Sequence, residues 1–145
     1  MAEFSASGLD SFMLSLQQIA EIPEEVRDEM LNAGADELVF AQREKVKAYG
    51  IYDLNNLETR HVADSISKGK PKNHKGMRVI YVSPKGNRKR GKTVTRNAEI
   101  LFVNEFGKRA QKARPAIHDA TEESADRVAQ AEFRVWDQHL KEQNL

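Results

Sequence analysis

The chain has 145 residues, a formal net charge of +1 and no cysteine. This length supports one hydrophobic core, so we predict a single domain over residues 1–145. Without cysteine the chain forms no disulfide, thiol nucleophile or zinc–thiolate site. The first ten residues lack the basic region of a signal peptide, and no apolar run is long enough to span a membrane.

Charge is strongly segregated along the chain. Residues 1–60 contain 12 acids and 5 bases (−7), residues 61–114 contain 3 acids and 15 bases (+12), and residues 115–145 contain 7 acids and 3 bases (−4). A basic middle between acidic ends can bind a polyanion such as DNA, or the acidic helices of a second copy. A solvated hairpin without a specific partner is the third possibility, and charge alone does not separate the three.

Helices are predicted from about residue 8 to residue 48. The first, over residues 8–20, has apolar residues at helical spacing: Leu9, Phe12, Leu16 and Ile19. A longer helix begins at Pro23, which is followed by two acids that the helix dipole favours in a first turn. Gly50 ends this helix, and we expect it to kink near Gly34.

The segment from about residue 50 to residue 76 is predicted to be irregular and basic. A short or broken helix is expected over Leu54–Ile66, with Leu57, Val62 and Ile66 facing inward. The stretch Lys68–Gly76 is polar, basic and rich in residues that break regular structure. Such a composition predicts a mobile loop.

A β hairpin is predicted over about residues 77–104. Met77–Val82 alternates and is rich in β-branched residues, which favours a strand. Ser83–Gly86 is a turn, Asn87–Lys92 a basic tip, and Thr93–Val103 the partner strand. The apolar run at residues 100–103 suits a buried strand and is too short for a helix with its own core face.

A turn and a basic loop lead into the last helix. Phe106 is expected to be an inward anchor, and Gly107 to supply a positive φ at the exit from the strand. The loop Lys108–Arg114 carries four cations and is expected to be exposed. Pro115 is expected to begin a helix that reaches about residue 141. The predicted fold is α+β, a small antiparallel sheet packed by long N-terminal and C-terminal helices.

The stretch Asn97–Ala120 reads NAEILFVNEFGKRAQKARPAIHDA. Its apolar run, Asn-Glu-Phe-Gly, basic loop and Ala-Arg-Pro-Ala-Ile resemble the signature of a family of small minor structural proteins of long-tailed (siphovirus-type) bacteriophages. These are the tail-completion or neck proteins. The family often has an aromatic residue after Arg-Pro, where this chain has Ala116. Asn55-Asn56-Leu57 also replaces a Thr-Gly-x-Leu stretch that often precedes the sheet in the family.

The resemblance implies a place in a virion and no chemistry. It implies a ring in the neck, with a hexamer favoured, made of copies of this chain beside connector or tail proteins. Localisation would be the virion, after assembly in the host cytoplasm. The family's structural motif falls here on Glu105, Phe106, Gly107 and Pro115.

The cations of the hairpin and of the second loop are the candidate interface or DNA-facing residues. These are Lys85, Arg88, Lys89, Arg90, Lys92, Lys108, Arg109, Lys112 and Arg114. The tip, residues 88–90, is expected to face passing DNA or an acidic face of an adjoining ring. Copies are expected to pair the acidic face of the helix from Glu24 with the basic loops at residues 68–75 and 85–92. A non-specific nucleic-acid-binding protein is the alternative function, although the few nearby aromatic residues are expected in or beside the sheet: Tyr81, Phe102 and Phe106.

One motif and the histidines are the features of the sequence that could indicate catalysis or ligand binding. Gly86–Thr93 matches the phosphate-binding pattern GxxxxGKT, which requires a helix starting at its Lys-Thr. Thr93-Val94-Thr95 favours a strand, so we expect no nucleotide site. The histidines show no metal-ligand spacing: His61, His74, His118 and His139. We therefore expect no catalysis, no cofactor and no metal.

Overall fold

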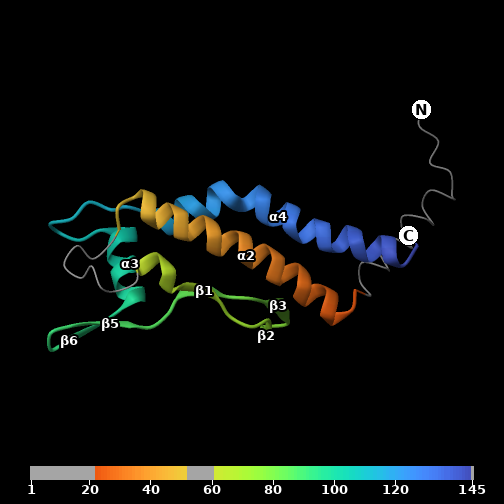
Figure 1. Ribbon diagram of the computed structural model, residues 1–145, viewed down its shortest axis with the longest axis horizontal. Helices are drawn as coiled ribbons and strands as arrows, with labels where there is room; N and C mark the ends of the chain where they lie inside the picture. The colour runs from red at the N-terminus through yellow and green to blue at the C-terminus, as the bar shows by residue number, and fades with distance from the viewer. Residues whose placement is uncertain (1–21, 52–60, 145) are drawn as a thin grey trace.

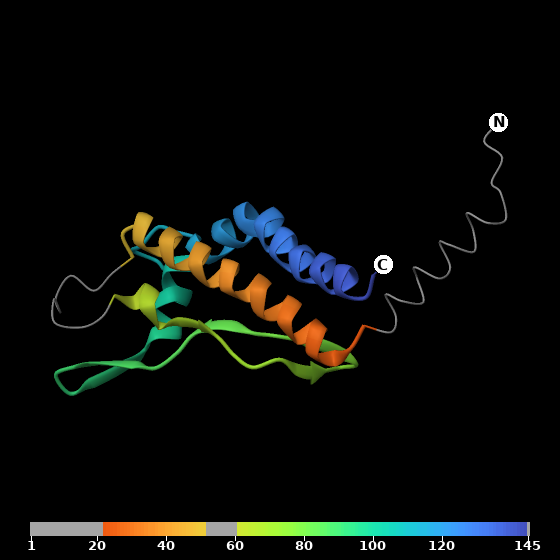
Figure 2. The same cartoon turned by 45° about the vertical axis from the view of Figure 1, so that its right-hand side comes forward.

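The computed structural model describes residues 22–51 and 61–144. In this part of the chain, helices α2 (Glu24–Ala48) and α4 (Ala116–Glu142) lie side by side. The short helix α3 (Asn97–Phe106) and the strands lie along one side of this helical pair (Figures 1 and 2). The predicted α+β class with two long helices is confirmed. The predicted helix over residues 8–20 and the inward position of Leu57 lie outside the described residues.

Helix α2 forms as its sequence predicts. Pro23 precedes it, two glutamates occupy its first turn, and Lys45 and Lys47 lie in its last turn, where each charge complements the helix dipole. Gly34 does not interrupt the helix. It is buried against α4, and a Cβ built there would lie 2.6 Å from Glu132 Oε1. The glycine therefore permits close helix packing.

Small residues and polar contacts join the two long helices. Ala116, Ala120 and Ser124 are the buried residues of α4. Gln42 Nε2 donates to Thr121 Oγ1 at 3.4 Å. Lys45 pairs with Glu123, and the Tyr49 hydroxyl donates to Asp119.

None of the described helices is both long and apolar enough to cross a membrane.

The strands form three separate antiparallel pairs. Strand β1 (Ile66–Lys68) pairs with β4 (Val82–Pro84), and β2 (Lys72–His74) pairs with β3 (Met77–Val79). Strand β5 (Asn87–Arg90) pairs with β6 (Thr93–Arg96). The prediction of one hairpin over residues 77–104 is therefore wrong, and so is the loop over residues 68–76, because β2 and the end of β1 lie in it.

Two cations from the basic middle tie these strands to α2. Arg78 donates from Nε and Nη2 to the two carboxylate oxygens of Asp28, both at 2.7 Å, and contacts Glu24 at 3.0 Å. Lys68 pairs with Asp36 at 2.8 Å. These acids belong to the face that we expected to meet another copy. Part of that predicted charge pairing occurs within one chain instead.

The segment predicted as the second strand of the hairpin contains a helix. Residues 97–106, including the apolar run Ile100–Val103, form α3. Its buried residues, Asn97, Leu101 and Asn104, follow the helical spacing i, i+4, i+7. The prediction failed because a four-residue apolar run fits either structure. Two of the three buried positions are also asparagines, so apolar residues alone do not show the helical period.

The core lies where α3, the start of α4 and the first strand meet the end of α2. A 3-10 turn, η1 (Val62–Ser65), closes it. The buried cluster consists of Val46, Ile51, Val62, Ala63, Ile66, Leu101 and Ala116. All of its members are aliphatic, so burial of apolar area stabilises this end of the molecule.

Candidate interface at the basic end

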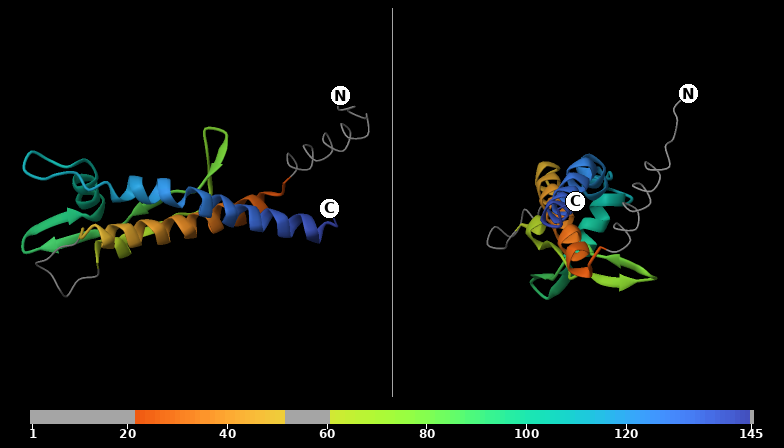
Figure 3. Two further views of the ribbon diagram at one scale, coloured as in Figure 1. Left: turned by 90° about the horizontal axis from the view of Figure 1, so that it is seen from above. Right: turned by 90° about the vertical axis from the view of Figure 1, so that its right-hand side faces the viewer.

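Two basic projections extend from the same end of the molecule. The β5–β6 hairpin and the loop at residues 107–115 flank α3 (Figures 1 and 3). We call residues 85–115 the basic end. They contain 10 bases and 2 acids, a net charge of +8. This concentration of charge makes the basic end the candidate functional surface.

The hairpin explains the glycines of the GxxxxGKT motif. Gly91, with φ +59°, is the first of two residues in the turn between β5 and β6, a position that favours glycine. Gly86, with φ +81°, precedes β5. Thr93 begins β6, so the expected absence of a helix at Lys92-Thr93 is confirmed. The motif lies on a hairpin rather than at a helix N-terminus.

The hairpin cations differ in how they are engaged. Lys89 and Lys92 are exposed and contact no other described residue through hydrogen bonds or ion pairs. Lys85 Nζ donates to Lys68 O at 3.2 Å, and Arg88 Nε donates to Asn97 Oδ1 at 3.0 Å. The side chain of Arg90 lies outside the description. Lys89 and Lys92 are thus the hairpin cations most available to a partner.

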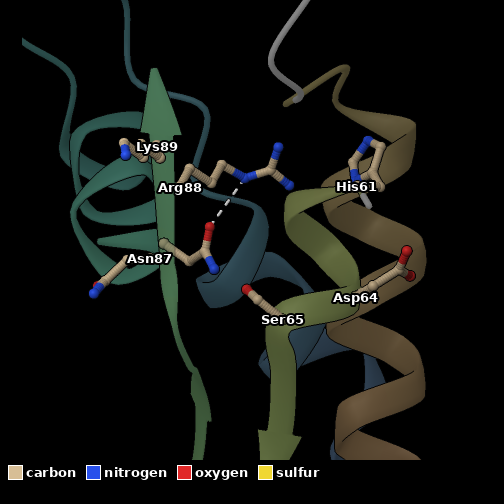
Figure 4. A pocket seen from close by; sticks show the side chains of 7 residues that line it. His61, Asp64, Ser65, Asn87, Arg88 and Lys89 are labelled. Atoms are coloured by element: carbon tan, nitrogen blue, oxygen red, sulfur yellow. Dashed lines mark hydrogen bonds between the residues drawn. The ribbon is translucent and has the colours of Figure 1, made fainter. Parts of the chain in front are cut away.

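A groove of about 350 Å³ runs beside the hairpin (Figure 4). Arg88 reaches across it toward His61. His61 Nδ1 accepts the backbone N–H of Ala63 at 3.0 Å and caps η1. Burial lowers the pKa of His61, Asp64 opposes this effect, and Lys47 and Arg88 add to it.

Ser65 also lines the groove, but its hydroxyl does not bond to the imidazole of His61 as a catalytic serine would bond to its base. Ser65 Oγ donates to Val62 O at 2.6 Å. A serine nucleophile requires its hydroxyl to contact a base. Here the hydroxyl and the imidazole Nδ1 both bond to backbone groups of η1, so this arrangement stabilises the 3-10 turn.

The second basic projection begins at a strained turn. Gly107 has φ +75° and ψ 179°, so the expected positive φ is confirmed. A Cβ there would lie 2.8 Å from Gln111 O and 2.9 Å from Ala113 N. Lys108 and Gln111 exchange backbone hydrogen bonds at 3.0 and 2.9 Å, which closes the loop. Only glycine fits this conformation without displacing the loop backbone.

Three loop cations are available and one is not. Lys108, Arg109 and Lys112 are exposed, and their side chains form no hydrogen bond or ion pair with another described residue. Arg114 instead donates to Asn104 Oδ1 at 2.5 Å, to Tyr49 O at 3.2 Å and to Gly50 O at 3.3 Å. Arg114 is therefore engaged within its own chain, unlike the other three cations of this loop. Its guanidinium joins the end of α2 to α3.

Sequence reasoning missed the acceptor at the centre of this junction. Asn104 Oδ1 accepts from Arg114 and also from Gln111 Nε2, at 2.9 Å. The one available signal was its spacing of seven residues from Asn97, which places both on the buried face of a helix. Pro115 directly precedes α4, close to its predicted place at the helix start.

The phenylalanine pair, Phe102 and Phe106, is the apolar feature of the basic end. The two side chains are 64% and 69% exposed, and their ring centroids lie 4.8 Å apart. The predicted inward position of Phe106 is wrong, because a helix places it one turn from Phe102 on the outer face. Exposed aromatic rings thus lie between the two basic projections.

The remaining histidines lie on other surfaces. The His74 and Tyr81 rings form a T-shaped pair, His118 Nδ1 lies 3.3 Å from Asp119 Oδ1, and His139 stacks on Trp136. Within residues 22–51 and 61–144, no three His, Asp or Glu side chains gather as they would around a metal ion.

Comparison of the chain with protein-family models, with characterised proteins and with solved structures gave no match.

Proposed function

We propose that this chain is a structural protein of a bacteriophage virion, a tail-completion or head–tail joining component that acts as a ring in the neck. The resemblance over Asn97–Ala120 supports this proposal. Gly107 and Pro115 have the turn and helix-start roles expected of the motif, although the segment before them is a helix rather than a strand. A hexamer of this chain beside connector or tail proteins is the proposed assembly.

The observation that carries the proposal is the division of charge in the folded chain. The basic end has a net charge of +8, whereas the segments of the helical pair, residues 22–50 and 116–145, have −3 and −4. Five basic-end cations have side chains that form no hydrogen bond or ion pair with another described residue: Lys89, Lys92, Lys108, Arg109 and Lys112. Surfaces of opposite charge on one subunit favour association with other subunits.

Deletion of the gene tests the proposal directly. Particles produced without the chain should include DNA-filled heads and separate tails when viewed by electron microscopy. The unaltered gene supplied in trans should restore joined, infectious particles. Normal joined particles in the deletion strain would exclude a neck function.

A charge-reversal variant tests the contribution of the basic end. Lys89, Lys92, Lys108 and Arg109 should be changed to Glu together, because their side chains are exposed and form no hydrogen bond or ion pair with a described residue. Arg88 and Arg114 should be left unchanged, since both hold neighbouring segments. The variant should keep its circular dichroism and fail to complement the deletion. The control exchanges Lys and Arg at the same four positions and should complement.

Non-specific nucleic-acid binding is the second candidate function. The observation that favours it is the phenylalanine pair between exposed cations, since aromatic faces stack on bases while cations bind phosphates. Retention of the purified chain on DNA at low salt, lost at about 1 M salt where screening shortens to about 3 Å, would support it. Equal retention of the parent and the four-site Glu variant would exclude binding through this end.

A further inference from the structure

A groove between the two long helices has the shape and composition to receive an apolar projection. It measures about 300 Å³ and is lined by Phe40, Ala41, Glu44, Lys45, Ala48, Ala120, Glu123 and Arg127. Phe40 is 61% exposed, and three alanines leave space beside its ring. An aromatic side chain and small residues around a hollow are typical of a site that accepts another aromatic group.

The groove faces away from the core and from the strands. Phe40, Glu44 and Ala48 are spaced by four residues and share one face of α2. Val46, a core residue, lies two positions from Glu44 and Ala48, about 200° around the helix. Helix α3 lies on the strand side of the helical pair (Figures 1 and 2). The phenylalanine pair of a chain therefore does not reach the groove of the same chain.

The charges around the groove complement the basic end. Two ion pairs at the groove are internal, Lys45 with Glu123 and Arg127 with Glu37. Glu44 on the rim and Asp126 beside Arg127 are exposed acids whose side chains form no hydrogen bond or ion pair with another described residue. Acids thus outnumber bases around the groove, as they do over the whole helical pair. Their negative charge complements the positive charge of Lys108, Arg109 and Lys112.

From these two surfaces we infer that the phenylalanine pair of one copy inserts into the α2–α4 groove of a second copy, with Lys108, Arg109 and Lys112 against its acidic rim. The two surfaces differ, so the contact is heterologous: the copy that inserts its phenylalanine pair keeps its groove free, and the copy that receives it keeps its own pair free. Repetition of such a contact closes a ring when the rotation between copies permits. The inference rests on the proposed function and specifies the contact between its subunits.

Site-directed crosslinking tests the contact without a background, because the chain has no cysteine. Ala98, four residues before Phe102 on α3, and Ala48 in the groove are both exposed alanines. One tagged chain carries Ala98→Cys and a differently tagged chain carries Ala48→Cys. Mixed at high concentration with a short bis-maleimide, they should yield a crosslinked heterodimer.

Two controls define a specific result. Ala129 is an exposed alanine of α4, about 120° around the helix from Glu123 and about 160° from Arg127, so a mixture of Ala129→Cys with Ala98→Cys should give only background. Phe102→Ser with Phe106→Ser in the Ala98→Cys chain should abolish the crosslink to Ala48→Cys. High salt should reduce the yield, because the rim contacts are ionic.

No heterodimer, equal yield with Ala129→Cys, or a yield unaffected by loss of both phenylalanines would each overturn the inference. If the phenylalanine substitutions abolish DNA retention while no heterodimer forms, the pair contacts nucleic acid instead. The outcome is separable from the proposed function. If no crosslink forms but the deletion strain produces unjoined heads and tails, this contact is rejected and the neck function stands. If the crosslink forms but the deletion strain produces normal particles, the neck function is rejected and the contact stands.

Discussion

Glu105 caps the first turn of α4 at His118. Glu105 Oε1 accepts the backbone N–H of His118 at 2.8 Å, and Oε2 accepts that of Ile117 at 3.0 Å. The residue that directly precedes α4, Pro115, provides no side-chain cap. A carboxylate from α3 therefore satisfies two of the N–H groups that a helix start leaves without intrahelical partners.

Removal of this cap should lower stability without altering the fold. Glu105→Ala should reduce the free energy of unfolding by about 1 kcal/mol, the usual loss when a helix cap is removed. Urea unfolding followed by circular dichroism measures the change. Glu122→Ala, at an exposed acid of the same helix without a described partner, is the control and should change stability little. Equal losses in the two variants would contradict the capping role.

Substitution of Arg114 should lower the free energy of unfolding much more than substitution of Arg109, because only Arg114 bonds to other parts of the chain. Arg114→Ala removes the donors to Asn104, Tyr49 and Gly50 and should cost about 1.5–3 kcal/mol of unfolding free energy. Arg114→Lys should recover only part, since an ammonium cannot reproduce the planar guanidinium fork. Arg109→Ala should lie within about 0.5 kcal/mol of the parent. A similar loss at both arginines, measured by urea unfolding, would refute the distinction.

The two faces of α3 should respond differently to truncation. Leu101 is 4% exposed and belongs to the core, so Leu101→Ala should cost about 2–5 kcal/mol. Phe106 is 69% exposed, and Phe106→Ala should cost less than about 1 kcal/mol in the monomer. Thermal or urea unfolding at low protein concentration makes the comparison. A large loss for Phe106→Ala would mean that the ring packs within its own chain.

The turn at Gly107 should accept no side chain. Gly107→Ala places a Cβ against two backbone groups at a positive φ and should cost about 1–3 kcal/mol. Gly91→Ala also has a positive φ, but nothing within 4 Å obstructs its Cβ, so its loss should be smaller. Differential scanning calorimetry of the two variants provides the test, and equal losses would point to backbone conformation alone.

The contact between Tyr49 and Asp119 should make the stability of the fold depend on alkaline pH. The hydrogen bond to Asp119, together with burial and nearby acids, raises the pKa of Tyr49 to about 12 from 10.0. Between these values the native state retains a proton that the unfolded state has lost, so stability should fall as pH rises from about 10 to about 12. Tyr49→Phe should be less stable at neutral pH but lack the decline that Tyr49 contributes. Urea unfolding over this range, with tyrosinate absorbance, measures both.

Acid pH should weaken the same contact, because the Asp119 carboxylate becomes protonated. The hydrogen bond from Tyr49, followed by that from His118, lowers the pKa of Asp119 below its ordinary 3.8. The contribution of this carboxylate is present above that value and is lost as pH falls through the lower folded-state pKa. Asp119→Asn should therefore unfold with a shallower dependence on acid pH. An unchanged slope would show that the carboxylate makes no net contribution to folding.

The long helices and the turn at Gly107 could be predicted because their determinants are local. Pro23 and its following glutamates mark a helix start, and a positive φ such as that of Gly107 favours glycine. The segregation of charge was likewise visible along the chain, since it depends on composition alone. These features need no knowledge of what lies nearby in space.

The tertiary structure decided the identity of α3 and the roles of the basic residues. An apolar run of four residues is compatible with a strand or a helix, and the fold selected a helix by burying Leu101 between two asparagines. Whether a cation is available depends on what lies beside it: Arg114 meets Asn104 and two carbonyls, whereas Arg109 meets solvent. Such contacts join residues distant in sequence, and for this reason the exposed phenylalanine pair and the internal arginine became apparent only in the folded chain.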